Sequence, residues 1–425
     1  MKKTLNHTVI PWFILTSSLV LGYLCSIVTE FNWNFSIALA LILTLAILYR
    51  NNFGKPHVAV ARTLLGLLFM FSGFVKGIDP LGTQYQVQDY FSAYGTTWAN
   101  PLSMMLSLAL ITAEFVVGVA LILNLRISVT AWITVLMMGF FTITTWLDAT
   151  IYSDKITDCG CFGKAITLSN WQTFFKNLVL NIWVVILFFG RYRIRNTFSL
   201  KNEVVMATLI TILFLSFQFY NLRHLPVIDF LDWKVGVKLN PPKTEPVTYL
   251  FTYKNKETQD VHEFDSKNLP TDLSTNWEFM ETTIIDPNPR NLMIPIFDNN
   301  SEDGYDVSDF VADYPGYFFI LAVNNLKKAK LFKNLDKIFH LKDFASQHEH
   351  QFMFLFDLNT SEKGIKKFRN SVDRNDFDIY FSDDKSIKAI VRSNPGLILL
   401  HDGVVVKKWA WRDLPTVEKI QELMK

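Results

Sequence analysis

Two cysteines separated by one glycine stand out among the residues of this 425-residue chain that could do chemistry. They lie in the segment Asp158-Cys159-Gly160-Cys161-Phe162-Gly163. A disulfide between them would close a small, strained ring, and strain raises the reduction potential of a disulfide and makes it labile. The two glycines supply the permissive backbone that so tight a loop requires. The spacing is therefore suited to thiol/disulfide exchange.

The same spacing leaves other interpretations open. Cys159 and Cys161 could be reduced and packed in a loop, or could form a fixed disulfide that does not turn over. A metal site fits less well, because two thiolates need two further ligands and no histidine is near in sequence, so no metal is predicted. Asp148 and Asp158 bracket the loop, where they either tune its thiols or are simply solvated. Cys25, in an apolar helix, acts as a small hydrophobe or as a resolving thiol.

Arg62, Lys76 and Glu114 are charged residues within or directly beside long apolar segments. An ionised carboxylate in the middle of a membrane helix costs at least about 2.5–3.5 kcal/mol unless it has a partner. Glu114 is therefore expected to be protonated, paired, or directed into a polar cavity. A hydrogen bond to Ser or Thr on a neighbouring helix would also satisfy it. Arg62 and Lys76 lie near opposite ends of one segment, so we expect them to anchor it by reaching toward water.

The charge distribution indicates which elements hold these residues. Residues 1–220 contain 14 basic and 8 acidic side chains, whereas residues 221–425 contain 27 basic and 31 acidic ones. The first half is thus about 10% charged and the second about 28%, against about 25% in soluble proteins. This division predicts a membrane domain joined to a water-soluble one. Disorder, a disulfide-rich miniprotein and a nucleic-acid-binding protein are excluded, because neither half has a strong basic excess and the apolar content is high.

Seven segments are long and apolar enough to cross a bilayer as helices. They run near Val9–Val28, Asn34–Tyr49, Val58–Val75, Pro101–Leu123, Ile127–Leu147, Trp171–Phe189 and Val204–Tyr220. Lysine and arginine gather in alternate loops, which favours a cytoplasmic N-terminus and a soluble half outside the cytoplasm. The aromatic segment from Gln84 to Trp98 is expected to lie in the outer interface or to cover the bundle.

The soluble half shows strands alternating with helices. A Pro-rich tether to about Pro246 precedes short strands at Val247–Tyr253 and Val261–Phe264. Strands are then predicted at Tyr317–Val323, Gln351–Leu358, Asp376–Phe381, Leu397–Leu400 and Val404–Trp409, with helices at Leu326–Ser346, Lys385–Val391 and Leu414–Met424. Asp402-Gly403 between two apolar runs predicts a hairpin. The pattern indicates an α/β domain.

The end of the chain resembles the thioredoxin fold. By this resemblance Pro395 is the cis-proline that faces the active-site loop. Where thioredoxins carry Cys-x-x-Cys, this chain reads Val323-Asn324-Asn325-Leu326, and its soluble half has no cysteine. Without a thiolate there is no nucleophile for exchange. The resemblance therefore implies a domain that docks partners, with Asn324, Asn325 and Pro395 as candidate contacts.

The membrane half resembles the DoxX and MauE families over about residues 57–190. Arg62-x-x-x-Gly66 and Phe71-Ser72-Gly73-x-x-Lys76 look like the first DoxX helix. Glu114-x-x-x-Gly118-x-x-Leu121, followed by Arg126, looks like the second, and Cys159-Gly160-Cys161-Phe162-Gly163 looks like the MauE motif. DoxX proteins are associated with quinone-linked sulfur oxidation and MauE proteins with disulfide formation in periplasmic partners. A DoxX-like membrane half joined to a thioredoxin-like half is similar to proteins of the Bacteroidetes.

These observations lead to a predicted organisation and two functional hypotheses. The predicted parts are two N-terminal spans in 1–56, a DoxX/MauE-like four-helix domain in 57–190, a seventh span in 191–221, a linker with a small β region in 222–310 and a thioredoxin-like domain in 311–425. The first hypothesis is a quinone-linked thiol oxidoreductase of a bacterial inner membrane. Cys159 and Cys161 would exchange with a periplasmic partner, and quinone would be reduced near Glu114. The second is a non-catalytic scaffold that recruits envelope proteins through its soluble domain.

Overall fold

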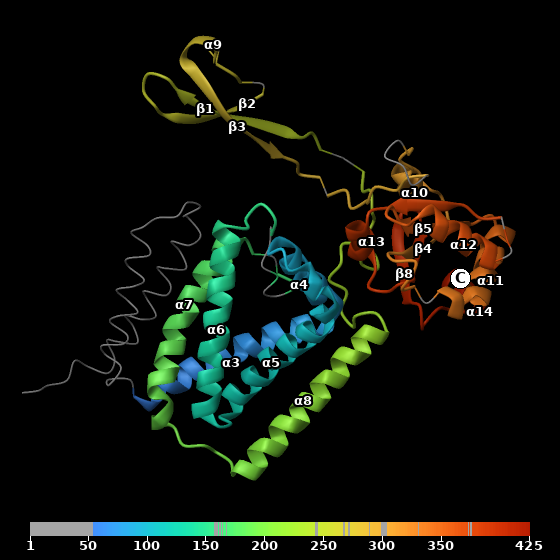
Figure 1. The fold of residues 1–425 in the computed structure, drawn as a ribbon. Helices are drawn as coiled ribbons and strands as arrows, with labels where there is room; N and C mark the ends of the chain where they lie inside the picture. Colours follow the sequence, from blue (N-terminus) through green and yellow to red (C-terminus); the bar gives the residue numbers. More distant parts are fainter. Residues whose placement is uncertain are drawn as a thin grey trace, which may run out of the picture. The chain divides into compact units, whose positions relative to one another are not determined.

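The computed structural model divides the chain into two compact units, Met1–Phe230 and Leu231–Lys425 (Figure 1). It describes residues 54–156, 160, 163, 165–166, 168–242, 245–266, 268–270, 273–288, 290–298, 304–329, 331–372, 374 and 376–425. Cys25, Asp158, Cys159 and Cys161 lie outside these residues, as do the first two predicted spans.

Five helices of the described part of the first unit are long and apolar enough to cross a membrane. They comprise α3 (Lys55–Ile78), α5 (Ser103–Leu123), α6 (Ile127–Thr150), α7 (Asn170–Gly190) and α8 (Leu200–Arg223). The last five predicted spans are confirmed by these helices, which extend several of them by a turn or less at either end. Gly54 precedes α3 with Pro56 in its first turn, and Ser169 caps α7 by accepting a hydrogen bond from the Gln172 amide.

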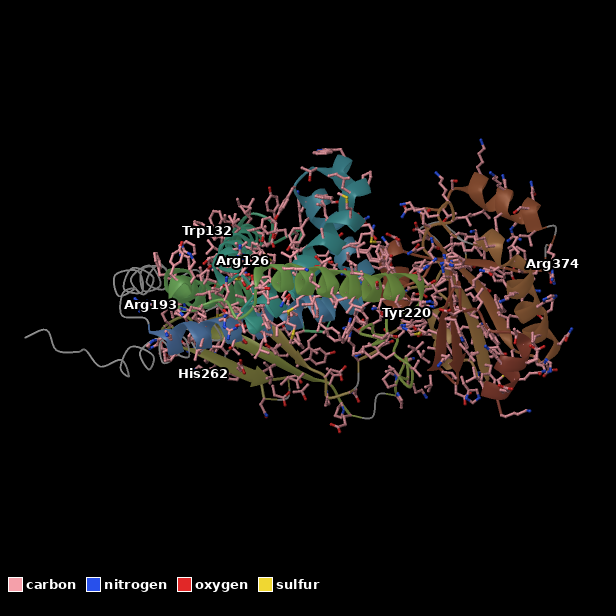
Figure 2. All side chains as sticks on the ribbon, turned by 90° about the horizontal axis from the view of Figure 1, so that it is seen from below. Arg126, Trp132, Arg193, Tyr220, His262 and Arg374 are labelled. Carbon is pink, nitrogen blue, oxygen red and sulfur yellow. The ribbon has the colours of Figure 1, made fainter. Side chains whose placement is uncertain are left out.

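Helix α3 packs along α5, and α6 packs along α7, while α8 contacts both α3 and α5 (Figure 1). Arg126 precedes α6 and Arg193 follows α7. Figure 2 shows both arginines toward the end of the bundle where α8 begins, and Tyr220 at the end where α8 finishes. The basic loops between these helices therefore share one end of the unit, as a membrane protein with alternating charge bias requires.

The segment between α3 and α5 is helical. It forms α4 (Pro80–Ala93) and a short 3-10 helix, η2 (Thr97–Leu102). Asp79 caps α4 by accepting a hydrogen bond from the Gly82 amide, and Pro80 occupies the first helical position. The segment from Gln84 to Trp98, expected to lie in the outer interface or to cover the bundle, is thus largely helical, and α4 packs against α3 and α5.

The second unit begins with a three-stranded antiparallel sheet in the order β2-β1-β3. The strands are β1 (Thr248–Asn255), β2 (Val261–Asp265) and β3 (Trp277–Ile285), and a short helix, α9 (Leu273–Asn276), precedes β3. The two predicted strands are confirmed, and β3 is an addition. Cross-strand pairing places aromatic rings on one face, where Tyr253 lies 5.6 Å from Phe279 and Phe264 lies 5.1 Å from Trp277.

A five-stranded mixed sheet in the order β6-β5-β4-β7-β8 forms the core of this unit. The strands are β4 (Tyr317–Val323), β5 (Gln351–Asp357), β6 (Ile379–Ser382), β7 (Gly396–His401) and β8 (Val404–Ala410). The helices are α10 (Ser308–Asp313), α11 (Leu335–Gln347), α12 (Glu362–Val372), α13 (Asp384–Ile390) and α14 (Val417–Leu423). β4, β5 and β6 are parallel to one another, and β7 and β8 form an antiparallel hairpin beside β4. All five predicted strands are present.

The residues that turn and close this sheet follow the sequence signals. Asp402 and Gly403 both have positive φ, at 52° and 72°, which gives the tight hairpin turn expected of this dipeptide. The peptide bond between Asn394 and Pro395 is cis. Both outer strands make backbone hydrogen bonds to irregular chain of the same unit. Phe297 exchanges two backbone hydrogen bonds with Phe381 of β6, and residues 236–239 bond to the β8 side of the hairpin.

The predicted helix at Leu326–Ser346 is wrong in its first half. Helix α11 begins only at Leu335, and a short 3-10 helix, η4 (Leu331–Lys333), precedes it. The side-chain oxygen of Asn325 accepts a hydrogen bond from the Lys328 amide, which holds a turn where the helix was expected to start.

Candidate functional site

Glycines bring α3 and α5 unusually close. A Cβ atom added to Gly73 would lie 2.6 Å from the Phe115 backbone nitrogen, and one added to Gly118 would lie 2.3 Å from that of Met70. Real Cβ atoms do not approach other atoms so closely, so both positions require glycine. Small residues at a membrane helix interface let backbones approach in this way. The glycines of the two sequence motifs therefore set the spacing at which their polar side chains meet.

Glu114 is the centre of a buried polar cluster at this interface. Its side chain is 1% exposed, and its Oε1 atom lies 2.7 Å from Nζ of Lys76. The Ser72 hydroxyl donates a hydrogen bond to Oε2 at 2.7 Å. The Lys76 ammonium also lies 5.8 Å from the centre of the Phe141 ring on α6, within cation–π range. Of the sequence interpretations of Glu114, an ion pair and a serine hydrogen bond are both present.

Lys76 is therefore not an anchor that reaches toward water, because its side chain is only 8% exposed and faces Glu114. Arg62 behaves differently. Its Nη1 atom donates to the carbonyl oxygens of Leu121 and Ile122 at 2.7 and 2.8 Å. These carbonyls belong to the last turn of α5, where intrahelical donors are lacking and the helix dipole favours a cation. Arg62 thus caps α5 from the neighbouring helix.

Helix α8 completes the polar interior from a part of the chain beyond the motifs. Nε2 of Gln218 donates to Oγ1 of Thr112 at 2.8 Å, and Nδ2 of Asn221 donates to the Gly77 carbonyl at 3.2 Å. Phe214 stacks on Phe115 with ring centres 3.8 Å apart. Both amide side chains are fully buried or nearly so. The cluster around Glu114 is thus enclosed in part by α8, which lies outside residues 57–190, where the family motifs were found.

Helix α4 is hydrogen-bonded to the last turns of α6. The hydroxyls of Tyr90 and Tyr94 donate to the two carboxylate oxygens of Asp148, at 2.8 and 3.2 Å. Asp148 is fully buried. Asn170, in the first turn of α7, donates from Nδ2 to the carbonyls of Asp148 and Ile156. The solvated role considered for Asp148 is therefore wrong, since this residue joins α4 to α6.

Gly160, between the two cysteines in sequence, lies against α4. A Cβ atom added to Gly160 would lie 2.1 Å from Oε1 of Gln86 and 2.2 Å from its Nε2 atom. Gly160 and Gly163 have φ of 54° and 55°, and the Gly163 amide donates to the Gly160 carbonyl at 2.9 Å. Glycine is favoured at such angles. The glycine between the two cysteines is thus packed against a side-chain amide of α4.

The proposed docking residues of the second unit lie together. Asn394, directly before cis Pro395, donates from Nδ2 to the Asn325 carbonyl at 2.8 Å. Asn324 is buried at the carboxyl end of β4. Ser393 donates to the Pro395 carbonyl and accepts from the Trp411 amide. Within the part of the chain that the structure describes, no cluster of three His, Cys, Asp or Glu residues could hold a metal.

Sequence reasoning missed two elements of these sites. Gln86 was not predicted, although three glutamines at positions 84, 86 and 88, in a half with few charged residues, indicate that this segment makes polar contacts. Asn221 and Gln218 were also missed. Two amides one turn apart on an apolar helix indicate a buried polar face in a membrane protein.

Residues 54–190 match a family model described as "Methylamine utilisation protein MauE". The helical unit is similar to MauE. The match covers α3 to α7 and ends before α8. Together with the five apolar helices, it supports a membrane location for this chain.

One curated relative is "Protein TlpB" of Flavobacterium psychrophilum, which is 24% identical over 162 residues. The aligned part is 36% of this chain and 43% of TlpB, so the chain spans less than half the length of that relative. No solved structure matches the chain.

Proposed function

We propose that this chain is a quinone-linked thiol/disulfide oxidoreductase that acts on extracytoplasmic proteins from a bacterial inner membrane. The observation that carries the proposal is the contact of Gly160 with Gln86, because Gly160 stands between the two cysteines in sequence and packs on the same bundle that encloses Glu114 and Lys76. The similarity to MauE supports the membrane part of the proposal. The DoxX resemblance of the α3 and α5 motifs adds the link to quinone.

The exchange step is a two-electron transfer between dithiols. A thiolate of the partner attacks the disulfide between Cys159 and Cys161, and that S–S bond breaks as a mixed disulfide forms. The second thiolate of the partner then displaces the enzyme sulfur, which leaves the partner oxidised and both cysteines reduced. The two protons of the partner thiols are released or pass to the enzyme thiols.

A quinone, as the second substrate, would take up two electrons and two protons when the cysteines are reoxidised. The buried ion pair fits this partner chemically, because Lys76 is a proton donor and Glu114 a proton acceptor in an apolar environment. Ser72 holds the second carboxylate oxygen and so fixes the orientation of Glu114. These residues would hold and move protons, and the enclosing helices would exclude water.

The second unit would dock the partner. We propose that its five-stranded sheet is a thioredoxin-like domain outside the cytoplasm, with Asn324, Asn325 and Pro395 at the docking surface. The hydrogen bond from Asn394 to Asn325 supports this, since it joins the loop after β4 to the segment containing the cis-proline. No cysteine follows Cys161 in the chain, so this domain has no thiol of its own to exchange.

Trapping of a mixed disulfide tests the enzyme proposal. In a Cys161→Ser variant the Cys159 thiolate can attack the disulfide of the oxidised partner, which is the reverse of the second step above. The mixed disulfide should then accumulate and dissociate on reduction, because no Cys161 thiolate is present to displace the partner sulfur from Cys159. Cys25→Ser is the matched control and should trap nothing. Quinone reduction by a reduced thiol partner that continues unchanged in Cys159→Ser membranes would overturn the proposal.

A non-catalytic scaffold is the second candidate, and the cysteine-free second unit favours it. In this case the chain would bind an envelope protein stoichiometrically through the docking surface. Affinity purification from membranes separates the two candidates. Capture that is unaffected by Cys159→Ser but lost in an Asn325→Ala, Asn394→Ala variant supports the scaffold.

A further inference from the structure

The three-stranded sheet of the second unit has an open edge at β3. The strand order is β2-β1-β3, so β3 pairs with β1 on one side and has no neighbouring strand on the other among the residues that the structure describes. β3 is nine residues long, and all of them except Trp277 are exposed. The outer strands of the five-stranded sheet, in contrast, bond to chain of their own unit. An open edge presents unpaired N–H and C=O groups to which another strand can bond.

One face of this sheet is apolar up to the β3 edge. Residues that pair across antiparallel strands lie on the same face of the sheet. Tyr253 of β1 pairs with Phe279 of β3, and Tyr249 pairs with Ile284. At the edge, Phe279 is 53% exposed and Ile284 is 61% exposed. A strand added beside β3 would therefore find apolar side chains to pack against on this face.

The opposite face of the sheet carries acidic residues. Thr252 of β1 pairs with Glu263 of β2 on one side and with Glu281 of β3 on the other. Glu278 of β3 pairs with Lys254, and the register shift beside Thr252 brings Glu278 and Glu281 onto the same face. In the part of the chain that the structure describes, neither glutamate of β3 forms an ion pair. The open edge is therefore negatively charged on this face.

These charges decide which kind of strand fits the edge. A second copy of β3, aligned so that the apolar faces are continuous, would add its own glutamates to the acidic face, and like charges on neighbouring strands are destabilising. An anionic bilayer surface would meet the same repulsion. A segment with basic residues at alternate positions would instead place a cation beside Glu281 and apolar side chains beside Phe279 and Ile284. Charge complementarity therefore favours a basic partner.

We propose that β3 is a docking edge that takes up an extended, basic segment of a partner protein by strand addition. Lysine or arginine side chains of the segment lie on the acidic face, and its alternate apolar side chains lie on the aromatic face. Main-chain hydrogen bonds to β3 supply affinity, and the alternating side chains supply specificity. This surface differs from the one formed by Asn324, Asn325 and Pro395, and the inference does not depend on thiol chemistry.

Binding of synthetic peptides to the full-length protein in detergent tests this proposal. The probe is a fluorescent peptide, as long as β3, in which lysine alternates with valine. One comparison peptide has glutamate in place of lysine, and another has N-methyl groups on its central amides. Both should bind about tenfold more weakly or less, because the first is repelled and the second cannot donate backbone hydrogen bonds. Hydrogen exchange should show that the lysine peptide protects alternate amides of β3, which are those that point away from β1.

Charge reversal at the edge gives a matched pair of variants. Glu281→Lys should weaken binding of the lysine peptide about fivefold and strengthen binding of the glutamate peptide by a similar factor. Glu257→Lys, in the exposed turn between β1 and β2, changes the net charge equally but lies outside β3, so it should leave both affinities unchanged.

Two kinds of result would overturn the inference. The first is unchanged affinity of the lysine peptide for Glu281→Lys, or equal binding of the N-methylated peptide. The second is protection of β3 without any peptide. If such protection rises with protein concentration, the occupant is a second copy of the chain. If it appears only on transfer into anionic vesicles, the occupant is a lipid surface.

Discussion

The Nζ atom of Lys76 lies 2.7 Å from Oε1 of Glu114, in a pair whose side chains are almost completely withdrawn from solvent. Each residue sits on a different helix, and the two positions are 38 residues apart in sequence. Removing two charges from water is costly, and their mutual attraction offsets the cost only with good geometry and further hydrogen bonds. Ser72 supplies one such bond. The stability of the α3–α5 interface therefore depends on both charges being present.

Replacing one residue of the Lys76–Glu114 pair should destabilise the protein more than replacing both. Glu114→Gln leaves Lys76 buried without a counter-charge, and the expected loss of unfolding free energy is about 3–5 kcal/mol. The double variant Lys76→Met, Glu114→Gln should lose less. Thermal unfolding in detergent, measured for the two single variants and the double variant, gives the coupling between them. Additive losses would show that the pair is not coupled.

The glycines of the α3–α5 interface should not tolerate a methyl group. Gly73→Ala is expected to destabilise the bundle by about 1–3 kcal/mol, because the new Cβ would overlap the Phe115 backbone. Gly139→Ala on α6 is the matched control, since a Cβ there would meet no atom within 4 Å. It should be neutral or stabilise α6 by up to about 1 kcal/mol. Equal unfolding temperatures for the two variants would contradict the close packing.

Arg62 should stabilise the folded protein through its hydrogen bonds to α5 rather than through its position near a membrane surface. Arg62→Met removes both bonds to the last turn of α5 and is expected to cost about 1–3 kcal/mol. Arg62→Lys keeps the charge but lacks the planar guanidinium, so it should restore only part of the loss. Hydrogen exchange of the backbone amides at the end of α5 measures the effect locally. Full recovery with lysine would favour simple anchoring.

The second unit should lose stability as the pH falls below about 6.5. Burial, together with the neighbouring His348 and His401, lowers the pKa of His350. The ring of His350 also faces Tyr317 at 5.3 Å and Phe344 at 6.4 Å. Because this pKa is lower in the folded state, the unfolded state binds a proton first as the pH falls.

Hydrogen exchange of β4 and β5 between pH 7.5 and 5, corrected for intrinsic rates, measures this effect in the full-length chain. His350→Gln should flatten the dependence in this range. The Asp343 and Asp376 carboxyls, whose pKa values are held low by Arg374, add a further loss only at more acidic pH. An unchanged slope in His350→Gln would exclude His350 as the cause.

Much of the fold follows from residue patterns within single segments. Apolar length predicts the five described spans, and Asp402-Gly403 predicts the hairpin, because these signals depend only on local sequence. β3 escaped prediction because its residues are mostly exposed on both faces and show no clean alternation. The start of α11 was misplaced because a side-chain turn at Asn325 competes with the helical spacing that follows it.

The candidate sites also combine residues that local sequence predicts with contacts that it does not predict. The residue types of Glu114, Lys76 and Arg62 mark them as exceptional in apolar segments, but their partners depend on how far α3 is shifted along α5. That shift is fixed by the close contacts of Gly73 with Phe115 and of Gly118 with Met70, which are a property of two helices together. Gln86 could not be placed for a related reason, since only the folded loop brings Gly160 onto α4.

The two outer strands of the five-stranded sheet are already bonded to other parts of the same unit, through Phe297 on one side and residues 236–239 on the other. Exposed strand edges are what allow sheets of different molecules to join and aggregate. Copies of this protein are confined to two dimensions by their membrane helices, which raises their local concentration greatly. An edge that is already paired in part offers a shorter template to another molecule, which would disfavour polymerisation through this sheet when the second units are crowded at a membrane.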